Sequence, residues 1–156
     1  NFTSVVATST TDNACDGLGI TRCTIIGTHA TAAANVFKMA AATDRVTIAD
    51  NYVAFSTTDT GASIVPCSTG KALTNLLLLR NQFNLTNAAA TATGYLITTD
   101  TTGSGYINGN YDFCLANTTY TSSLKVTAGR SFRFGNNYHC RTADTSPGAV
   151  LPTADS

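Results

Sequence analysis

The sequence predicts a single mainly-β domain over residues 1–156, an antiparallel β-sandwich with one or two short helices and disulfide bracing. The composition carries 29 Thr, no Glu and a single Gln, so it is poor in strong helix formers and rich in strand and turn formers. Several segments alternate apolar and polar residues between turn signals, which is typical of half-buried strands. Five Cys supply candidate bridges, and 156 residues suit one domain.

Charge and hydropathy exclude several classes of protein. Lys and Arg number 9, Asp and Glu also number 9, so the net charge is zero and gives no strong case for nucleic acid as a partner. With 43% hydrophobic residues, the chain has enough apolar surface to fold. Its longest aliphatic run, Leu76 to Leu79, is too short to cross a bilayer. The chain begins with Asn, which is consistent with removal of a signal peptide or an N-terminal anchor.

The two chain ends are predicted to be irregular or extended, and two internal segments are predicted to be helical. Residues 1–13 are expected to form a mobile arm or an edge strand that can be exchanged with a neighbouring subunit. Seven Ala within residues 29–42 predict a helix capped near Thr31. Leucines at helical spacing favour a second helix over residues 71–83, although a buried strand is the alternative. Residues 142–156, with no periodicity, are expected to be an irregular tail.

Two hairpins are predicted from turn residues and alternation. Asp50 and Asn51 would form a two-residue loop that pairs Ile48 with Val53. The same register pairs Val46 with Phe55, so that the apolar residues share one face.

The second hairpin would use Ala128, Gly129 and Arg130 as its loop. It pairs Val126 with Phe132 and Leu124 with Phe134, and it places Lys125 opposite Arg133 on the other face. A turn signal at Asn108 and Gly109 lies between these two predicted hairpins.

The chain has no C-x-x-C pair, so structural zinc is not expected. The cysteines instead predict disulfides in an oxidising compartment. Our preferred pairing joins Cys15 to Cys23 and Cys114 to Cys140, each worth about 2 to 4 kcal/mol. Other pairings are open. Cys67 is left over, and it is interpreted as a buried free thiol or, alternatively, as an intermolecular bridge or a reactive thiol.

A basic segment gives the chain its only charge asymmetry, since no acid occurs from Phe113 to Ala143. The candidate patch for an anionic partner consists of Lys125, Arg130, Arg133, His139 and Arg141. Its partner would be an acidic polysaccharide, a phosphate backbone or an acidic face of a neighbouring subunit. The alternative is a solvated strand face whose charges oppose aggregation.

Other candidate sites are weaker. Oxygen ligands between Asp100 and Asp112 could hold calcium, but a polar hairpin loop is favoured, and no metal or cofactor is predicted. Sequons at Asn1, Asn84 and Asn117 could accept N-glycans.

Catalysis is poorly supported. The two His residues, His29 and His139, lie in no hydrolase motif, and a glycosidase would have to use Asp alone.

The composition resembles that of extracellular filament subunits and surface adhesins. We therefore predict a non-enzymatic extracellular or cell-surface protein, a structural or adhesive subunit of a filament, pilus or similar assembly, whose partners are its own copies or other surface subunits. The alternative is a carbohydrate-binding module in which Tyr106, Tyr111 and Tyr120 stack on a polysaccharide. A small secreted hydrolase is the third possibility.

Overall fold

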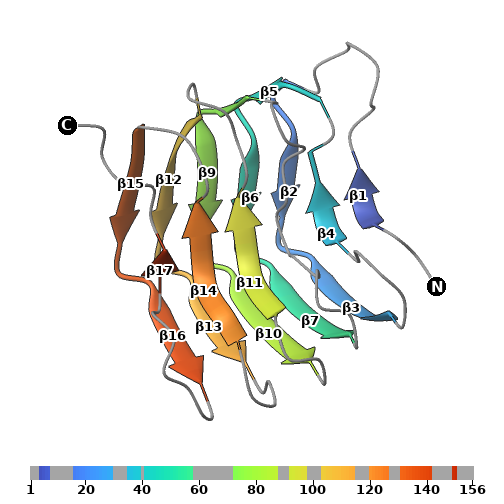
Figure 1. Cartoon of the computed structure of the whole chain (residues 1–156). Helices are drawn as coiled ribbons and strands as arrows, with labels where there is room; N and C mark the ends of the chain where they lie inside the picture. Colours follow the sequence, from blue (N-terminus) through green and yellow to red (C-terminus); the bar gives the residue numbers. More distant parts are fainter. Residues whose placement is uncertain are drawn as a thin grey trace.

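The chain folds as a parallel β-solenoid in the computed structural model (Figure 1). The structure describes residues 4–7, 16–29, 35–39, 41–57, 72–87, 92–97, 103–114, 120–126, 131–141 and 149–150. All regular elements in these segments are strands. Consecutive strands along the chain enter different sheets, and each sheet gathers strands from successive coils.

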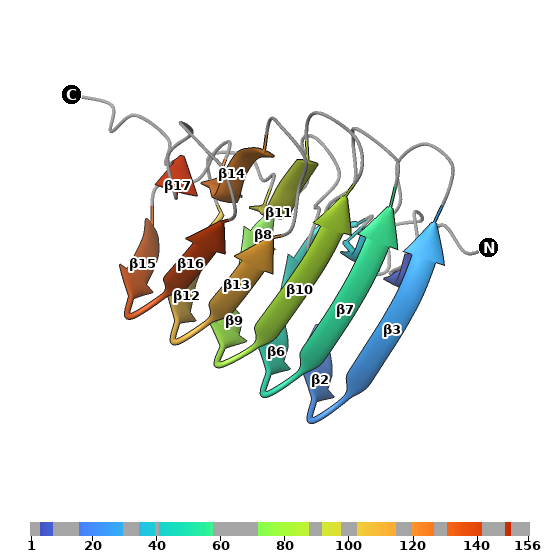
Figure 2. The same cartoon turned by 90° about the horizontal axis from the view of Figure 1, so that it is seen from below.

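Two five-stranded sheets form the main body. The first sheet has the order β15 (Ser131–Gly135), β12 (Ser104–Asn108), β9 (Leu76–Leu79), β6 (Thr47–Ala49) and β2 (Gly19–Thr21). The second sheet has the order β16 (Tyr138–Arg141), β13 (Tyr111–Cys114), β10 (Gln82–Asn87), β7 (Tyr52–Thr57) and β3 (Thr24–His29). Figure 2 shows the second sheet with all of its arrows pointing the same way.

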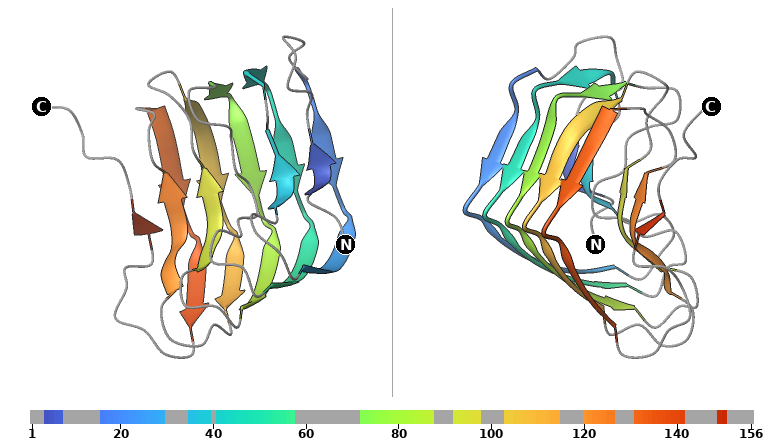
Figure 3. Two further views of the ribbon diagram at one scale, coloured as in Figure 1. Left: turned by 45° about the vertical axis from the view of Figure 1, so that its right-hand side comes forward. Right: turned by 90° about the vertical axis from the view of Figure 1, so that its left-hand side faces the viewer.

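Shorter sheets complete the coils. One pairs β1 (Ser4–Ala7) with β4 (Asn35–Lys38), and another has the order β11 (Ala92–Ile97), β14 (Tyr120–Val126) and β17 (Ala149–Val150). A third pairs β5 (Thr43–Asp44) with β8 (Leu73–Thr74). Figure 3 (right) looks along the stack and shows the first and second sheets meeting at a corner.

Like residues stack inside the coils. In the first sheet Ile48 is in register with Ile20 on one side and with Leu78 on the other, and Ile107 continues the row. Ile48, Leu78 and Ile107 are fully buried. Burying one such side chain contributes about 1.5 to 3 kcal/mol, so the aliphatic row holds successive coils together.

Four asparagines stack at the corner between the two main sheets: Asn51, Asn81, Asn110 and Asn137, which we call the asparagine ladder. Each of the first three donates from Nδ2 to the Oδ1 of the next, at 2.9 Å. Each Nδ2 also donates to a backbone carbonyl of the preceding coil; for Asn81 this is the oxygen of Ile48, at 2.8 Å. The ladder therefore satisfies backbone groups that the corner would otherwise leave without partners.

The residue before each ladder position has left-handed backbone. Its φ is +58° at Asp50, +50° at Arg80, +67° at Gly109 and +48° at Asn136. Arg22, with φ +56°, begins the same corner in the first coil, where Cys23 takes the place of the asparagine. The backbone N–H of Cys23 donates to Oδ1 of Asn51 at 3.0 Å, so the ladder also reaches that coil.

The parallel topology overturns the predicted antiparallel sandwich and its first hairpin. Asp50 and Asn51 do form a turn, but this turn is a corner that sends β6 and β7 into different sheets. Ile48 consequently pairs with Leu78, and Val53 pairs with Phe83. A left-handed residue followed by a buried asparagine bends the chain without reversing it.

The second hairpin is also wrong. Its loop residues lie outside the described segments, but its two strands belong to different sheets. Leu124 pairs with Tyr95, whereas Phe134 pairs with Ile107. Lys125 and Arg133 therefore do not face each other across a strand pair.

Neither predicted helix is found among the described residues, most of which form strands in these two segments. Residues 35–38 form β4, where Val36 and Phe37 are both fully buried. Residues 73–74, 76–79 and 82–87 form strands, and Leu76 and Leu78 alternate with exposed Leu77. Asn75 and Arg80 both have positive φ and form corners, so the alternation of buried and exposed residues starts again after each of them. This interruption gives the leucines their helical spacing. Helix propensity is a weak preference that packing between coils overrides.

No disulfide is found in the described segments, so the predicted bracing is not seen there. Cys23 is a free, exposed thiol, and Cys15 and Cys67 fall outside the described segments. Cys114 and Cys140 lie on adjacent strands, but the register pairs Cys114 with Arg141 and Cys140 with Phe113.

The chain ends contribute two short strands. Within the predicted arm, β1 pairs with β4 of the same chain, and within the predicted tail, β17 pairs with β14.

Candidate functional site

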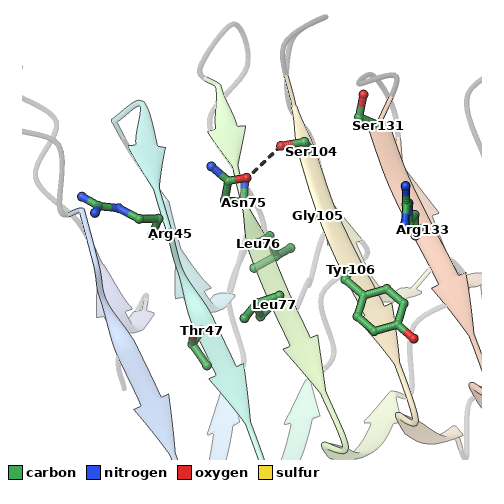
Figure 4. Close-up of a pocket in the computed structure, with 10 residues that line it drawn as sticks. All are labelled: Arg45, Thr47, Asn75, Leu76, Leu77, Ser104, Gly105, Tyr106, Ser131 and Arg133. Carbon is green, nitrogen blue, oxygen red and sulfur yellow. Dashed lines mark hydrogen bonds between the residues drawn. The ribbon is translucent and has the colours of Figure 1, made fainter.

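An open groove of about 370 Å³ lies on the outer face of the first sheet. We call it the Tyr106 groove. It is lined by Arg45, Thr47, Asn75, Leu76, Leu77, Ser104, Gly105, Tyr106, Ser131 and Arg133 (Figure 4). The lining comes from four successive coils, so the groove is a product of the stacking and belongs to no single segment.

One register row forms the middle of the groove. Thr47 pairs with Leu77, Leu77 with Tyr106, and Tyr106 with Arg133, so the four side chains run across neighbouring strands. Alternation within each strand sends this row outward and the neighbouring aliphatic row inward. Leu77 is 39% exposed and Tyr106 is 41% exposed. The row thus presents an apolar and aromatic surface with one cation at its end.

Two glycines allow close contacts in the strands that carry this surface. A Cβ on Gly105 would lie 2.6 Å from the carbonyl oxygen of Leu76, so this position has no space for a side chain. A Cβ on Gly135 would lie 3.8 Å from the hydroxyl oxygen of Tyr106 and 2.9 Å from Oδ1 of Asn108. The phenol of Tyr106 therefore reaches across to the neighbouring strand β15.

A polar row borders the groove at the ends of these strands that lie opposite the asparagine ladder. It comprises Asp16, Asp44, Asn75 and Ser104, and we call it the Asp44 row. Asp16 accepts a hydrogen bond from the Asp44 backbone N–H at 2.9 Å, and Ser104 Oγ accepts one from the Asn75 backbone N–H at 3.0 Å. Hydrogen bonds from the Thr74 hydroxyl and the Asn75 amide, both 2.7 Å, lower the pKa of Asp44.

The charges that line the groove are both positive. Arg45 makes an exposed ion pair with Asp44, Nε to Oδ2, at 3.1 Å. Arg133 is exposed and has no ion pair among the described residues. By contrast, Arg80 at the asparagine corner is bound by both oxygens of Asp50, at 2.7 and 2.8 Å. The lining contains no acidic residue, although the whole chain is neutral.

The predicted basic patch is divided among three sheets. Arg133 lies on β15 in the groove, Lys125 lies on β14, and His139 and Arg141 lie on β16. Arg130 is outside the described segments. Of the described members of the patch, Arg133 lines the groove, and so does Arg45, which the sequence reasoning did not select.

The three candidate tyrosines are also separated. Tyr106 lies in the groove, whereas Tyr111 follows the next corner, in the second sheet, where its ring stacks on that of Tyr138 at 5.1 Å between centroids. Tyr120 begins β14. Tyr106 is thus the candidate that lines the groove described above.

The remaining candidates are scattered. Asp112 lies on β13, but Asp100 is outside the described segments, as are Asn1 and Asn117. Asn84 is half-buried on β10, and its buried Oδ1 has no hydrogen-bond partner among the described residues. In the part of the chain that is described, no group of three or more His, Cys, Asp or Glu could hold a metal ion.

The sequence did carry a signal for this arrangement. The asparagines of the ladder are separated by 30, 29 and 27 residues, and each precedes Tyr or Gln. A nearly constant period of this kind indicates a solenoid. Reading it would have aligned Thr47, Leu77, Tyr106 and Arg133 as one row.

Within the described segments, no helix is long and apolar enough to span a membrane. No protein-family model matches this chain, and neither a curated protein nor a solved structure matches it.

Proposed function

We propose that this protein is a non-enzymatic extracellular structural or adhesive protein, in which the solenoid is a rigid support and the Tyr106 groove contacts a saccharide chain. The observation that carries the proposal is the exposed aromatic ring of Tyr106 in an open groove bordered by hydroxyl and amide groups. Sugars present apolar faces to aromatic rings and hydroxyls to polar side chains. The Thr-rich composition, with few charges, is consistent with an extracellular location.

The stacked coils favour an extended ligand. The middle row of the groove crosses β6, β9, β12 and β15, whose spacing is about 4.8 Å per strand. A linear chain lying along the solenoid axis would meet an equivalent position on each coil. Contacts of modest strength on several coils would then add up, as adhesion requires.

The test is binding to a panel of immobilised soluble polysaccharides. Tyr106→Ala is expected to weaken binding at least about tenfold, which corresponds to about 1.4 kcal/mol. Tyr138→Ala is the matched control, because Tyr138 is an exposed aromatic residue of the second sheet, outside the groove. Equal loss in both variants, or no binding to any saccharide by the wild-type protein, would contradict the proposal.

A second candidate function is assembly of copies into a filament. It is favoured by the ends of the two main sheets, because no described strand pairs with the outer edges of β2, β3, β15 or β16. Unpaired parallel edges are templates for strand addition. Sedimentation and electron microscopy of concentrated protein are expected to show end-to-end polymers, and monomers at all concentrations would contradict this assembly.

A further inference from the structure

We propose that the Tyr106 groove selects acidic saccharides, with Arg133 as the principal contact for a sugar carboxylate and Arg45 as a second one. This inference rests on the saccharide binding proposed above and specifies its ligand class.

The first argument is the distribution of charge. The groove lining carries two Arg and no Asp or Glu, in a chain whose net charge is zero. Within the lining itself the charge is therefore positive without any global excess, while Asp44 and Asp16 lie in the bordering row. Such a local concentration favours anionic groups of a ligand over neutral ones.

The second argument is the difference in pairing between the arginines. Arg80 is held by both carboxylate oxygens of Asp50, so its guanidinium is already occupied. Arg133 is exposed, and it has no ion pair within the described segments. A planar guanidinium with free N–H groups binds a carboxylate through two parallel hydrogen bonds. Arg133 is thus prepared for an external anion, whereas Arg80 serves the fold.

The third argument is the arrangement of groups along the groove. Arg133 is in register with Tyr106, so the cation lies next to the aromatic ring on the neighbouring strand. Ring stacking and charge pairing can therefore act on one sugar unit or on two adjacent units. Arg45 lies three strands away from β15, about 14 Å at about 4.8 Å per strand. It is shared with Asp44, so its contribution is expected to be smaller.

The polar border completes the site. Ser104, a member of the Asp44 row, is in register with Ser131 on β15, and both serines line the groove. Ser104 Oγ already accepts a hydrogen bond from the backbone of Asn75, so its own proton remains for a ligand oxygen. These hydroxyls suit the ring hydroxyls of a sugar. They distinguish this face from a purely electrostatic surface.

The experiment compares three probes by titration with the full chain: polygalacturonate, a neutral dextran and single-stranded DNA. The wild-type protein is expected to bind polygalacturonate at least about tenfold more tightly than dextran, with affinity falling as salt is raised. Arg133→Gln is expected to remove most of this preference, Arg45→Gln about a threefold part of it, and Arg133→Lys should restore part of the loss. Arg22→Gln is the matched control, an exposed arginine at the asparagine corner outside the groove.

The outcomes separate this inference from the proposed function. Equal binding of polygalacturonate and dextran, sensitive to Tyr106→Ala but not to Arg133→Gln, would overturn acidic selectivity and leave saccharide binding in place. DNA binding as tight as polygalacturonate binding, with the same dependence on Arg133, would overturn the saccharide assignment in favour of a general polyanion site. Absence of binding to both saccharides would overturn the proposed function and this inference together. Circular dichroism of each variant checks that the fold is retained.

Discussion

The asparagine ladder and the Asp44 row both join successive coils at a corner, but one is buried and the other is open to solvent. Asn51, Asn81 and Asn110 are at most 3% exposed, and their amides bond to backbone and to one another. The Asp44 row bonds through partly exposed side chains and borders the groove. The difference separates stability from recognition, because buried hydrogen bonds are expensive to break and exposed ones exchange readily with water.

The largest effect that tests this contrast is expected for Asn81→Ala. The substitution leaves the backbone N–H of Asn51 and the carbonyl of Ile48 without their partners in a buried corner. Each orphaned group costs about 1 to 3 kcal/mol, so the free energy of unfolding should fall by about 3 kcal/mol. Urea denaturation measures it. A loss below about 1 kcal/mol would show that the ladder does not hold the coils together.

The next effect concerns the close approach of β12 to β9. Gly105→Ala would place a methyl group 2.6 Å from the Leu76 carbonyl oxygen and 2.8 Å from its Cβ. Neither of these atoms is the end of a flexible side chain, so the strands must shift, at a cost of about 2 kcal/mol. Gly19→Ala is the control, since nothing lies within 4 Å of its Cβ position. Thermal unfolding of both variants should separate them, and equal melting temperatures would refute the packing described for Gly105.

A smaller effect on stability is expected from protonation of Asp50, the exposed carboxylate at the asparagine corner. The hydrogen bonds from Arg80, and then the charges of Arg80 and Arg22, lower the pKa of Asp50 in the folded protein. A lowered folded pKa contributes stability above the unfolded value of about 4, and this contribution is lost as pH falls through the folded value. The urea midpoint of the wild-type protein should therefore decrease below about pH 4 more than that of Asp50→Asn.

Raising the salt concentration provides a control for the pH experiment. Asp50 is exposed, so 1 M salt should reduce the difference between wild type and Asp50→Asn. Parallel acid profiles for the two proteins at low salt would show that Asp50 does not couple the coils.

The smallest effect is expected in the Asp44 row. Ser104→Ala removes the hydroxyl that accepts the Asn75 backbone N–H, but that N–H can bond to water instead. The free energy of unfolding should change by less than about 0.5 kcal/mol, as at other surface positions. The same urea titrations used for Asn81→Ala provide the measurement. A loss comparable with that of Asn81→Ala would abolish the distinction between the two corners.

The sequence predicts which residues form strands and turns far better than it predicts which strands pair with one another. Alternation identifies Ile48 and Val53 as buried strand residues, and Asp50 is correctly placed in a turn. Whether that turn reverses the chain is decided by Asn81, 30 residues away, whose side chain bonds to Asn51. The same residues, Asp and Asn, favour a hairpin turn and a solenoid corner, so in the sequence only the repeat period distinguishes the two.

The candidate site was predicted only in part for a related reason. Tyr106 and Arg133 were both singled out, but for different surfaces, and Arg45 was not selected. Parallel stacking brings together residues that are one coil apart in the chain, and such neighbours are visible only once the register is known. Within the helix expected over residues 29–42, the prediction for the described residues 35–38 failed differently, since helix propensity is a weak preference and β4 gains more by burying Val36 and Phe37.

The asparagine ladder also allows whole coils to be added to the molecule or removed from it. Each coil repeats the same corner after 27 to 30 residues and adds one strand spacing of about 4.8 Å. Every new coil offers the same amide to the next, so duplication or loss of a whole coil leaves both faces continuous. Length can therefore change in fixed steps during evolution without a new core, and a groove that crosses the coils would lengthen with it.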